Sequence, residues 1–140
     1  MRYWDASALV ALLVEEPSTS SARAALTEDA GIVTWWASRI ECASAIARLE
    51  RSAALSSFDA ARALDILRTL ADGWHEVLPS EALRETACRL LRIHPLRSAD
   101  AMQLAAATVM AGGQPGRTGF LCFDRRLRDA AEHEGFLVGP

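Results

Sequence analysis

Short apolar runs alternate along the chain with longer segments in which apolar residues recur at helical spacing. The apolar runs predict strands at residues 1–5, 32–36, 74–78, 120–123 and 136–138. The longer segments predict helices at residues 6–16, 18–29, 38–52, 57–71, 80–92, 98–111 and 125–134, with a loop at 112–119. The resulting order, βααβααβααβαβ, is typical of a parallel sheet covered by helices on both faces.

The ends of these segments carry the residues that usually stop helices and strands. Pro17 ends the first predicted helix, Gly73 ends the one at 57–71, and Pro79 stops a strand. No linker, repeat or low-complexity tract interrupts the pattern. We therefore expect an α/β fold, with a central and mostly parallel sheet of four to five strands, in a single domain spanning residues 1–140.

The bulk composition agrees with one domain and narrows its surroundings. The chain has 140 residues, of which 51% are hydrophobic, enough to bury a core. No apolar run approaches the length of a membrane span, and no basic leader precedes the first strand. The three cysteines lack CxxC spacing, which indicates reduced thiols and no zinc site. These features predict a cytoplasmic protein that does not enter a membrane.

All 15 basic residues are arginine, and the absence of lysine excludes several classes of chemistry. A P-loop, a Schiff-base enzyme and a phospho-receiver domain each need a lysine. The net charge of −3 is unusual for a nucleic-acid-binding protein. If a metal neutralised four of the 18 acids, 15 arginines would face 14 acids, a balance that is compatible with RNA binding.

Four acidic residues sit where a predicted strand ends or a predicted helix begins: Asp5, Glu41, Asp100 and Asp124. Because strand ends and helix starts meet at one edge of a parallel sheet, we expect these side chains to converge. At about 5–6 Å and an effective dielectric of about 20, each carboxylate pair repels by roughly 3 kcal/mol, so a converged set must be neutralised. Oxygen ligands suit Mg²⁺ or Mn²⁺, which predicts metal-assisted hydrolysis of phosphodiesters.

Each acid also has a local explanation. Asp5 and Asp124 stand where an N-cap is expected, and Asp100 falls in the first turn of a helix. Glu41 follows Ser38 at capping-box spacing. Local capping and convergence on a metal therefore both remain open at each position.

The acids lie in motifs that resemble the PIN-domain family, specifically toxins of the VapC type from bacterial type II toxin–antitoxin systems. The family begins with Asp, a small residue and Ser-Ala, carries a Glu on a helix, and has the stretch Asp-Ala-x-x-Leu-Ala-x-Ala. The matching segments, in order and in register across the chain, are Trp4-Asp5-Ala6-Ser7-Ala8-Leu9, Glu41, Asp100-Ala101-Met102-Gln103-Leu104-Ala105-Ala106-Ala107, and Phe123-Asp124-Arg125-Arg126-Leu127.

The resemblance implies a PIN-like three-layer α/β/α fold with the four acids as the catalytic and metal-binding residues. Ser7 would orient Asp5 or a metal-bound water. One residue departs from the family pattern, because Cys122 stands where Ser or Thr is frequent, and a thiol is the poorer hydrogen-bonding group. Asp129, one helical turn beyond the last motif acid, is interpreted as a surface residue.

These features predict an Mg²⁺-dependent endoribonuclease, with Mn²⁺ as a substitute, that hydrolyses RNA with a metal-activated water. A toxin of this type implies a small antitoxin partner and a homodimer, with helical surfaces near residues 9–14 and 46–67 as contacts. Trp36 is a candidate for stacking on an RNA base. The alternative is a catalytically silent PIN-like module whose acidic pocket binds a partner's arginine. A haloacid-dehalogenase-type phosphatase is excluded for two reasons. Its nucleophile motif is Asp-x-Asp, whereas Asp5 is followed by Ala6 and Ser7, and the lysine that it requires is absent.

Overall fold

A five-stranded parallel sheet forms the centre of the protein, as a computed structural model describing residues 2–139 shows. The spatial order of the strands is β3-β2-β1-β4-β5, and every neighbouring pair runs parallel. The strands are β1 (Arg2–Trp4), β2 (Val33–Trp35), β3 (His75–Val77), β4 (Gly119–Leu121) and β5 (Leu137–Val138). The first strand is therefore central, and it pairs with β4 from the far end of the sequence, Tyr3 lying opposite Phe120.

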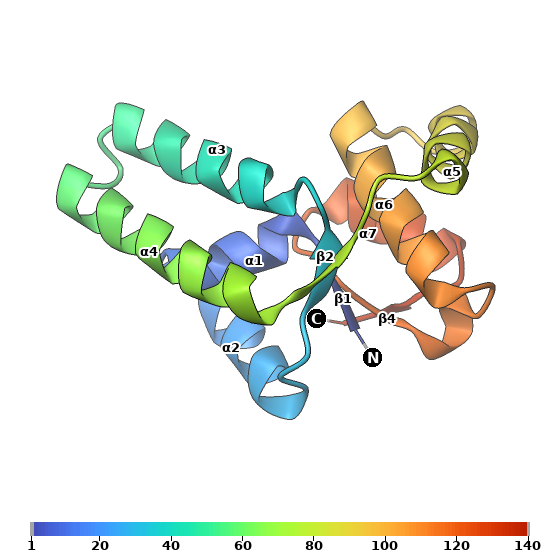
Figure 1. Cartoon of the computed structure of the whole chain (residues 1–140), viewed down its shortest axis with the longest axis horizontal. Coiled ribbons are helices and arrows are strands. Elements are labelled where there is room, and N and C mark those ends of the chain that lie inside the picture. Colours follow the sequence, from blue (N-terminus) through green and yellow to red (C-terminus); the bar gives the residue numbers. More distant parts are fainter. Residues whose placement is uncertain (1, 140) are drawn as a thin grey trace.

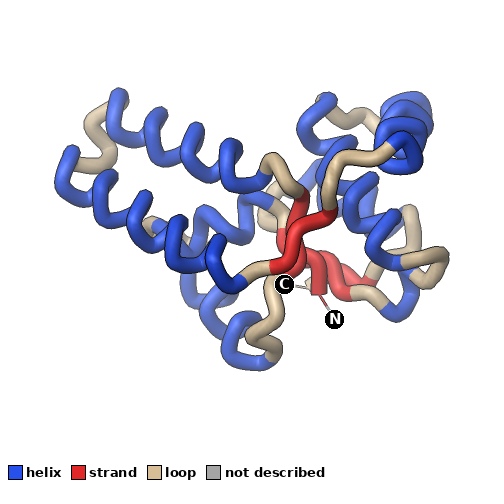
Figure 2. The backbone as a smooth tube through the Cα atoms, in the orientation of Figure 1, coloured by secondary structure: helices blue, strands red, loops and turns tan. Residues whose placement is uncertain are grey.

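Among the described residues, seven α-helices cover the two faces of this sheet, which gives the expected three-layer α/β/α fold. They are α1 (Ala6–Leu13), α2 (Thr19–Glu28), α3 (Ser38–Arg51), α4 (Ser57–Gly73), α5 (Glu81–Ile93), α6 (Ser98–Ala111) and α7 (Arg125–His133). In Figure 1, α3 and α4 lie side by side and extend away from the sheet, while α5 and α6 lie on its other side. Figure 2 shows the short strands gathered between these two groups of helices.

The alternation of side chains along the strands divides the interior into two cores. Tyr3 and Phe120 point to one face and stack with their rings 5.4 Å apart, in the core completed by α5, α6 and α7. Trp4 and Leu121, the next residues on the same strands, point to the opposite core, which α1 to α4 complete. Both faces are buried, as expected for a parallel sheet.

The predicted order of strands and α-helices agrees with the structure; the loop predicted at 112–119 contains a short 3₁₀-helix, η1 (Pro115–Arg117), and the other differences lie at the ends of elements. The first predicted strand includes residue 1, which lies outside the described residues. The first helix was expected to reach residue 16, but α1 ends at Leu13, and Val14 is extended. Pro17 disfavours a helical backbone conformation at the preceding residue, Glu16. The Thr19 hydroxyl donates to the Val14 carbonyl and accepts from the Glu16 N–H, which holds the chain outside the helix.

Two serines that resemble helix caps in the sequence do not act as caps. Ser38 and Ser98 are the first residues of α3 and α6, and the preceding residues, Ala37 and Arg97, occupy the N-cap positions. The expected capping box between Ser38 and Glu41 is therefore wrong. The Ser38 hydroxyl is buried and takes part in side-chain hydrogen bonds inside the protein instead.

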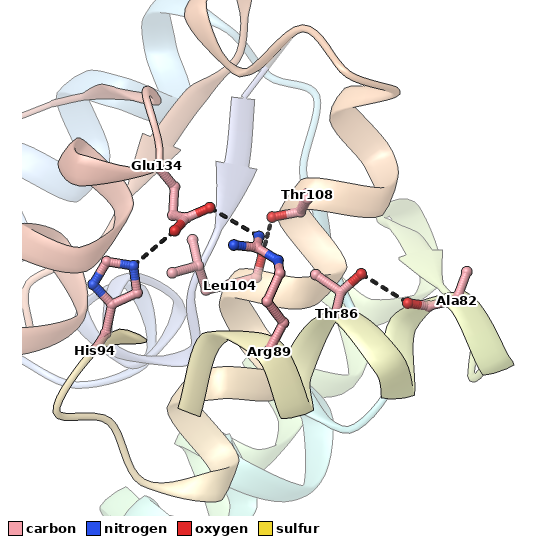
Figure 3. A network of polar contacts seen from close by, with 7 residues as sticks. All are labelled: Ala82, Thr86, Arg89, His94, Leu104, Thr108 and Glu134. Carbon is pink, nitrogen blue, oxygen red and sulfur yellow. Dashed lines mark hydrogen bonds and ion pairs between the residues drawn. The ribbon is translucent and has the colours of Figure 1, made fainter. Parts of the chain in front are cut away.

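A polar cluster ties the C-terminal end of α7 to α5. The Glu134 carboxylate accepts a hydrogen bond from Arg89 at 2.9 Å and contacts His94 Nε2 at 2.7 Å (Figure 3). Burial raises the pKa of Glu134, but the hydrogen bonds and positive charges of these partners outweigh burial and leave that pKa below its ordinary value.

Among the described residues, no helix is long and apolar enough to cross a membrane.

Candidate metal-binding and catalytic site

Asp5 is held at the carboxyl end of β1, where the chain turns into α1. It is the N-cap of α1, and its carboxylate accepts hydrogen bonds from the Ser7 N–H at 2.9 Å and the Ser7 hydroxyl at 2.5 Å. The Cys122 thiol also donates to this carboxylate, at 3.4 Å. Ser7 in turn accepts from the Phe123 N–H at 2.9 Å, which joins the start of α1 to the end of β4. The side chain is almost completely buried, so its orientation is fixed.

Glu41 is oriented by a residue that the sequence analysis did not select. The amide of Gln103, fully buried in α6, donates to Glu41 Oε1 at 3.0 Å and to the Ser38 hydroxyl at 2.9 Å. The Tyr3 hydroxyl donates to Gln103 Oε1 at 2.6 Å. Since the carbonyl side of the amide faces Tyr3, its NH₂ group must face Ser38 and Glu41. Gln103 therefore sets the position of the Glu41 carboxylate.

The buried hydrogen bonds continue from Ser38 into the sheet. The Thr34 hydroxyl donates to the Trp4 carbonyl at 2.7 Å, so the Ser38 hydroxyl donates to Thr34 Oγ1, also at 2.7 Å. Each hydroxyl in this chain donates once, and Ser38 is left free to accept from Gln103. A fully satisfied network of this kind is rigid, because any rotation breaks a buried hydrogen bond.

Asp100 and Asp124 occupy the starts of α6 and α7. Asp100 is partly buried, and its carboxylate accepts from the Arg97 N–H at 3.4 Å. Asp124 is exposed, caps α7, and accepts from the Leu127 N–H at 2.9 Å. The local role predicted for an acid at a helix start is thus present at both positions.

The same four acids nevertheless line one cavity. Its volume is about 690 Å³, and Ser7 lines it together with Asp5, Glu41, Asp100 and Asp124. Capping and convergence are therefore not exclusive, because each cap fixes a carboxylate at the edge of the sheet where the helix starts meet. Four further polar residues that were not predicted as site residues also line this cavity: Glu16, Ser18, Ser44 and Arg48.

The electrostatics of the cavity favour a positively charged ligand. The pKa of Glu41 is raised to about 7, mainly by burial and also by the negative charges of Asp5 and Asp100, against the opposing hydrogen bond from Gln103. Burial likewise raises the pKa of Asp100, with a contribution from the charge of Asp124. The acids therefore lie close enough to repel one another, and a cation would relieve that repulsion.

The donor atoms fit a hard divalent cation, although the side chains are not arranged as a finished ligand set. Within residues 2–139, no three His, Cys, Asp or Glu side chains stand together in position to hold one ion. Asp5 and Asp124 are turned toward backbone N–H groups, and Glu41 is turned toward Gln103. The oxygen atoms of these carboxylates are the donors that suit Mg²⁺ or Mn²⁺.

Cys122 contacts one of the four acids, whereas Trp36 lies away from the acidic cavity. The Cys122 thiol contacts Asp5 and lies 3.6 Å from the Ser7 hydroxyl, and burial raises its pKa, so it stays a neutral hydrogen-bond donor. Trp36 is 47% exposed and lines a separate apolar cavity with Met102, not the acidic one. Stacking of Trp36 on a base bound among the acids therefore has no support from this arrangement.

Comparison with known proteins identifies the family. The model of the PIN domain matches residues 2–133. The ribonuclease VapC45 of Mycobacterium tuberculosis (strain CDC 1551 / Oshkosh) is 34% identical over 141 residues, covering 99% of this chain and 94% of the relative. The ribonuclease VapC49 of strain ATCC 25618 / H37Rv has the same identity and coverage, and the ribonuclease VapC47 of strain CDC 1551 / Oshkosh is 32% identical over 99% of this chain and 95% of its own. The chain therefore belongs to the PIN-domain family and is of the VapC type.

Proposed function

We propose that this chain, as a single PIN domain, is an Mg²⁺- or Mn²⁺-dependent endoribonuclease and the toxin of a toxin–antitoxin pair. The observation that carries the proposal is the convergence of Asp5, Glu41, Asp100 and Asp124 on one cavity at the carboxyl edge of the sheet. Relatives aligned over nearly the whole chain are named as ribonucleases, which supports the same activity here.

The four acids would hold the divalent cation, which would supply a Lewis acid for the scissile phosphate and the attacking water. Asp5 is the most rigid of them, because Ser7 and Cys122 fix its carboxylate from two sides. Glu41 is fixed by its hydrogen bond from Gln103. Asp124 is exposed, so it would meet the substrate from the solvent side. This division gives two pre-oriented carboxylates and a more accessible one around the reacting phosphate.

The proposed partner is a small antitoxin whose segment covers part of the helical surface. A groove of about 350 Å³ runs between α1 and α4, within the segments expected to make such contacts, and Leu12, Leu55 and Ile66 line it. Phe58, at the start of α4, is 72% exposed. We further propose that the protein acts in the cytoplasm as a homodimer, with light scattering at micromolar concentration as the measurement that checks its size.

The function is tested by incubating purified protein with total RNA in Mg²⁺, Mn²⁺ or EDTA and sequencing the new ends. A nuclease with the proposed site gives defined new ends with either ion and none in EDTA. Asp124→Asn serves as the matched inactive variant, since an amide oxygen still caps α7. A silent interaction module would leave RNA intact under all conditions, and that result would refute the proposal.

A further inference from the structure

A second cavity, about 670 Å³ in volume, opens beside the acidic one. It is lined by three arginines, Arg97, Arg125 and Arg126, and by Asp129. It shares Ala99, Asp100 and Asp124 with the acidic cavity, so the two spaces meet along one wall. A strand that placed one phosphate among the acids would extend into this arginine-lined cleft.

The three arginines have no ion pair with any described residue, although other arginines of the chain do. Arg23, Arg68 and Arg84, for example, are each paired with a neighbouring carboxylate. The guanidinium groups of the cleft are exposed, and the charges of Arg97 and Arg126 act on Asp100 only from beyond ion-pair distance. They are therefore available to bind an external anion.

Their positions in the fold are unfavourable unless an anion is present. Arg125 and Arg126 are the first two residues of α7, whose first turn contains no acid, and Arg97 is the N-cap of α6. A cation at the positive end of a helix is unfavourable, whereas an acid at the same place would be favourable. A phosphate bound between the two helix starts would reverse this cost.

We propose that Arg97, Arg125 and Arg126 form a subsite for backbone phosphates of a single RNA strand, next to the scissile phosphate. This inference rests on the proposed ribonuclease function and names how its substrate is held. Arginine suits the role because its planar fork binds two phosphate oxygens at once. Without a bound cation, the charges of three arginines in the cleft are balanced by three acids, Asp100, Asp124 and Asp129. A cation held by Asp100 and Asp124 would neutralise those two acids and leave the negative charge of Asp129 against the three arginines. The subsite therefore becomes attractive to phosphate when the acidic cavity is loaded.

The test measures binding of a fluorescein-labelled 12-nucleotide single-stranded RNA by anisotropy, with Ca²⁺ or EDTA present, at several salt concentrations. Arg125→Ala/Arg126→Ala should lower the salt slope by about 1.4, because each lost phosphate contact with a single strand removes about 0.7. If the variant and the wild type bind equally at about 1 M salt, this change of slope corresponds to about 25-fold weaker binding by the variant at 0.1 M salt. Arg125→Lys/Arg126→Lys keeps the charges, so it should retain the slope and lose only a few-fold in affinity.

The matched control is Arg51→Ala/Arg92→Ala, which removes the same charge from exposed arginines in the last turns of α3 and α5. We expect near-normal RNA binding from this control, and a lower melting temperature because two cations leave favourable helix ends. The cleft variant should melt at the same temperature as the wild type or higher. Equal losses of RNA affinity in the two double variants would overturn the subsite.

The failure of the subsite can be told apart from failure of the ribonuclease proposal. If the wild-type protein cleaves RNA with Mg²⁺ while Arg125→Ala/Arg126→Ala binds and cleaves normally, only the subsite is refuted. If the wild-type protein neither binds nor cleaves RNA, both are refuted. A raised KM with a nearly unchanged kcat in the cleft variant would support a role in holding the strand.

Discussion

Replacing Gln103 with leucine is expected to damage both the core and the acidic cavity. The change keeps a side chain of similar size but removes hydrogen bonds to Tyr3, Ser38 and Glu41. Stranding the buried Tyr3 hydroxyl costs about 1–3 kcal/mol, and losing a donor to a charged carboxylate costs about 1.5–3 kcal/mol. Burial of the apolar leucine returns about 1–2 kcal/mol, so we expect a net destabilisation of about 3 kcal/mol, within a range of roughly 0.5–5 kcal/mol.

A double-mutant cycle with Tyr3→Phe isolates the contribution of this hydrogen bond. Tyr3→Phe alone strands the Gln103 carbonyl, whereas the double variant removes both polar groups. In urea unfolding with EDTA present, the losses of unfolding free energy in the two single variants should therefore sum to about 1–2 kcal/mol more than the loss in the double variant. Additive losses would show that the pair is not coupled.

The same variants test whether Gln103 positions Glu41. Removal of a residue that orients a metal ligand typically lowers metal affinity by about 10–100-fold. Gln103→Leu should therefore weaken Mn²⁺ binding by calorimetry within that range. Thr108→Val is the control, because Thr108 lies on the same helix but only donates to the Leu104 carbonyl. Unchanged Mn²⁺ affinity in a folded Gln103→Leu protein would refute the reasoning.

Three further outcomes follow from the described contacts. Asp100→Asn should reduce RNA cleavage ~100-fold or more and raise the melting temperature in EDTA, because one source of repulsion is removed. The pKa of Glu134 is lower in the folded protein than its ordinary value of 4.5. The carboxylate therefore contributes fully to the free energy of unfolding at pH values above 4.5, and this contribution is lost as the pH falls through the lower pKa of the folded state. Glu134→Gln should therefore cost about 1–2 kcal/mol in unfolding experiments at pH 7 and little in strong acid. Cys122→Ser should keep the hydrogen bond to Asp5 and leave RNA cleavage at least as fast, as a kinetic assay would show.

The element order and the positions of the acids could be predicted because they depend on local sequence. Asp5 follows an apolar strand and precedes an apolar helix, and Asp124 does the same near the end of the chain. Those two neighbours are enough to place a residue at the carboxyl edge of a parallel sheet. The capping roles could be predicted for the same reason at both positions. Helix ends were less certain, as α1 shows, because Thr19 competes for the backbone groups of the last turn.

The role of Gln103 could not be predicted from its neighbours, because its partners come from distant parts of the chain. Tyr3 precedes it by 100 positions and Ser38 by 65. One signal was present: a lone amide among apolar residues of the 98–111 helix, on a face that must be buried. Ser38 misled the prediction for the opposite reason, since its spacing from Glu41 matches a local motif while its hydroxyl is used in tertiary contacts.

The pairing of β1 with β4 has a consequence for synthesis of the protein on the ribosome. Asp5 is made early, whereas Cys122, which contacts it, is made 117 residues later, and Asp124, which also lines the cavity, follows shortly after. While these residues are still in the exit tunnel, β4 cannot dock beside β1. A nascent chain therefore lacks the complete acidic cavity until β4 and the start of α7 have left the tunnel, so the proposed nuclease activity would not begin before that point.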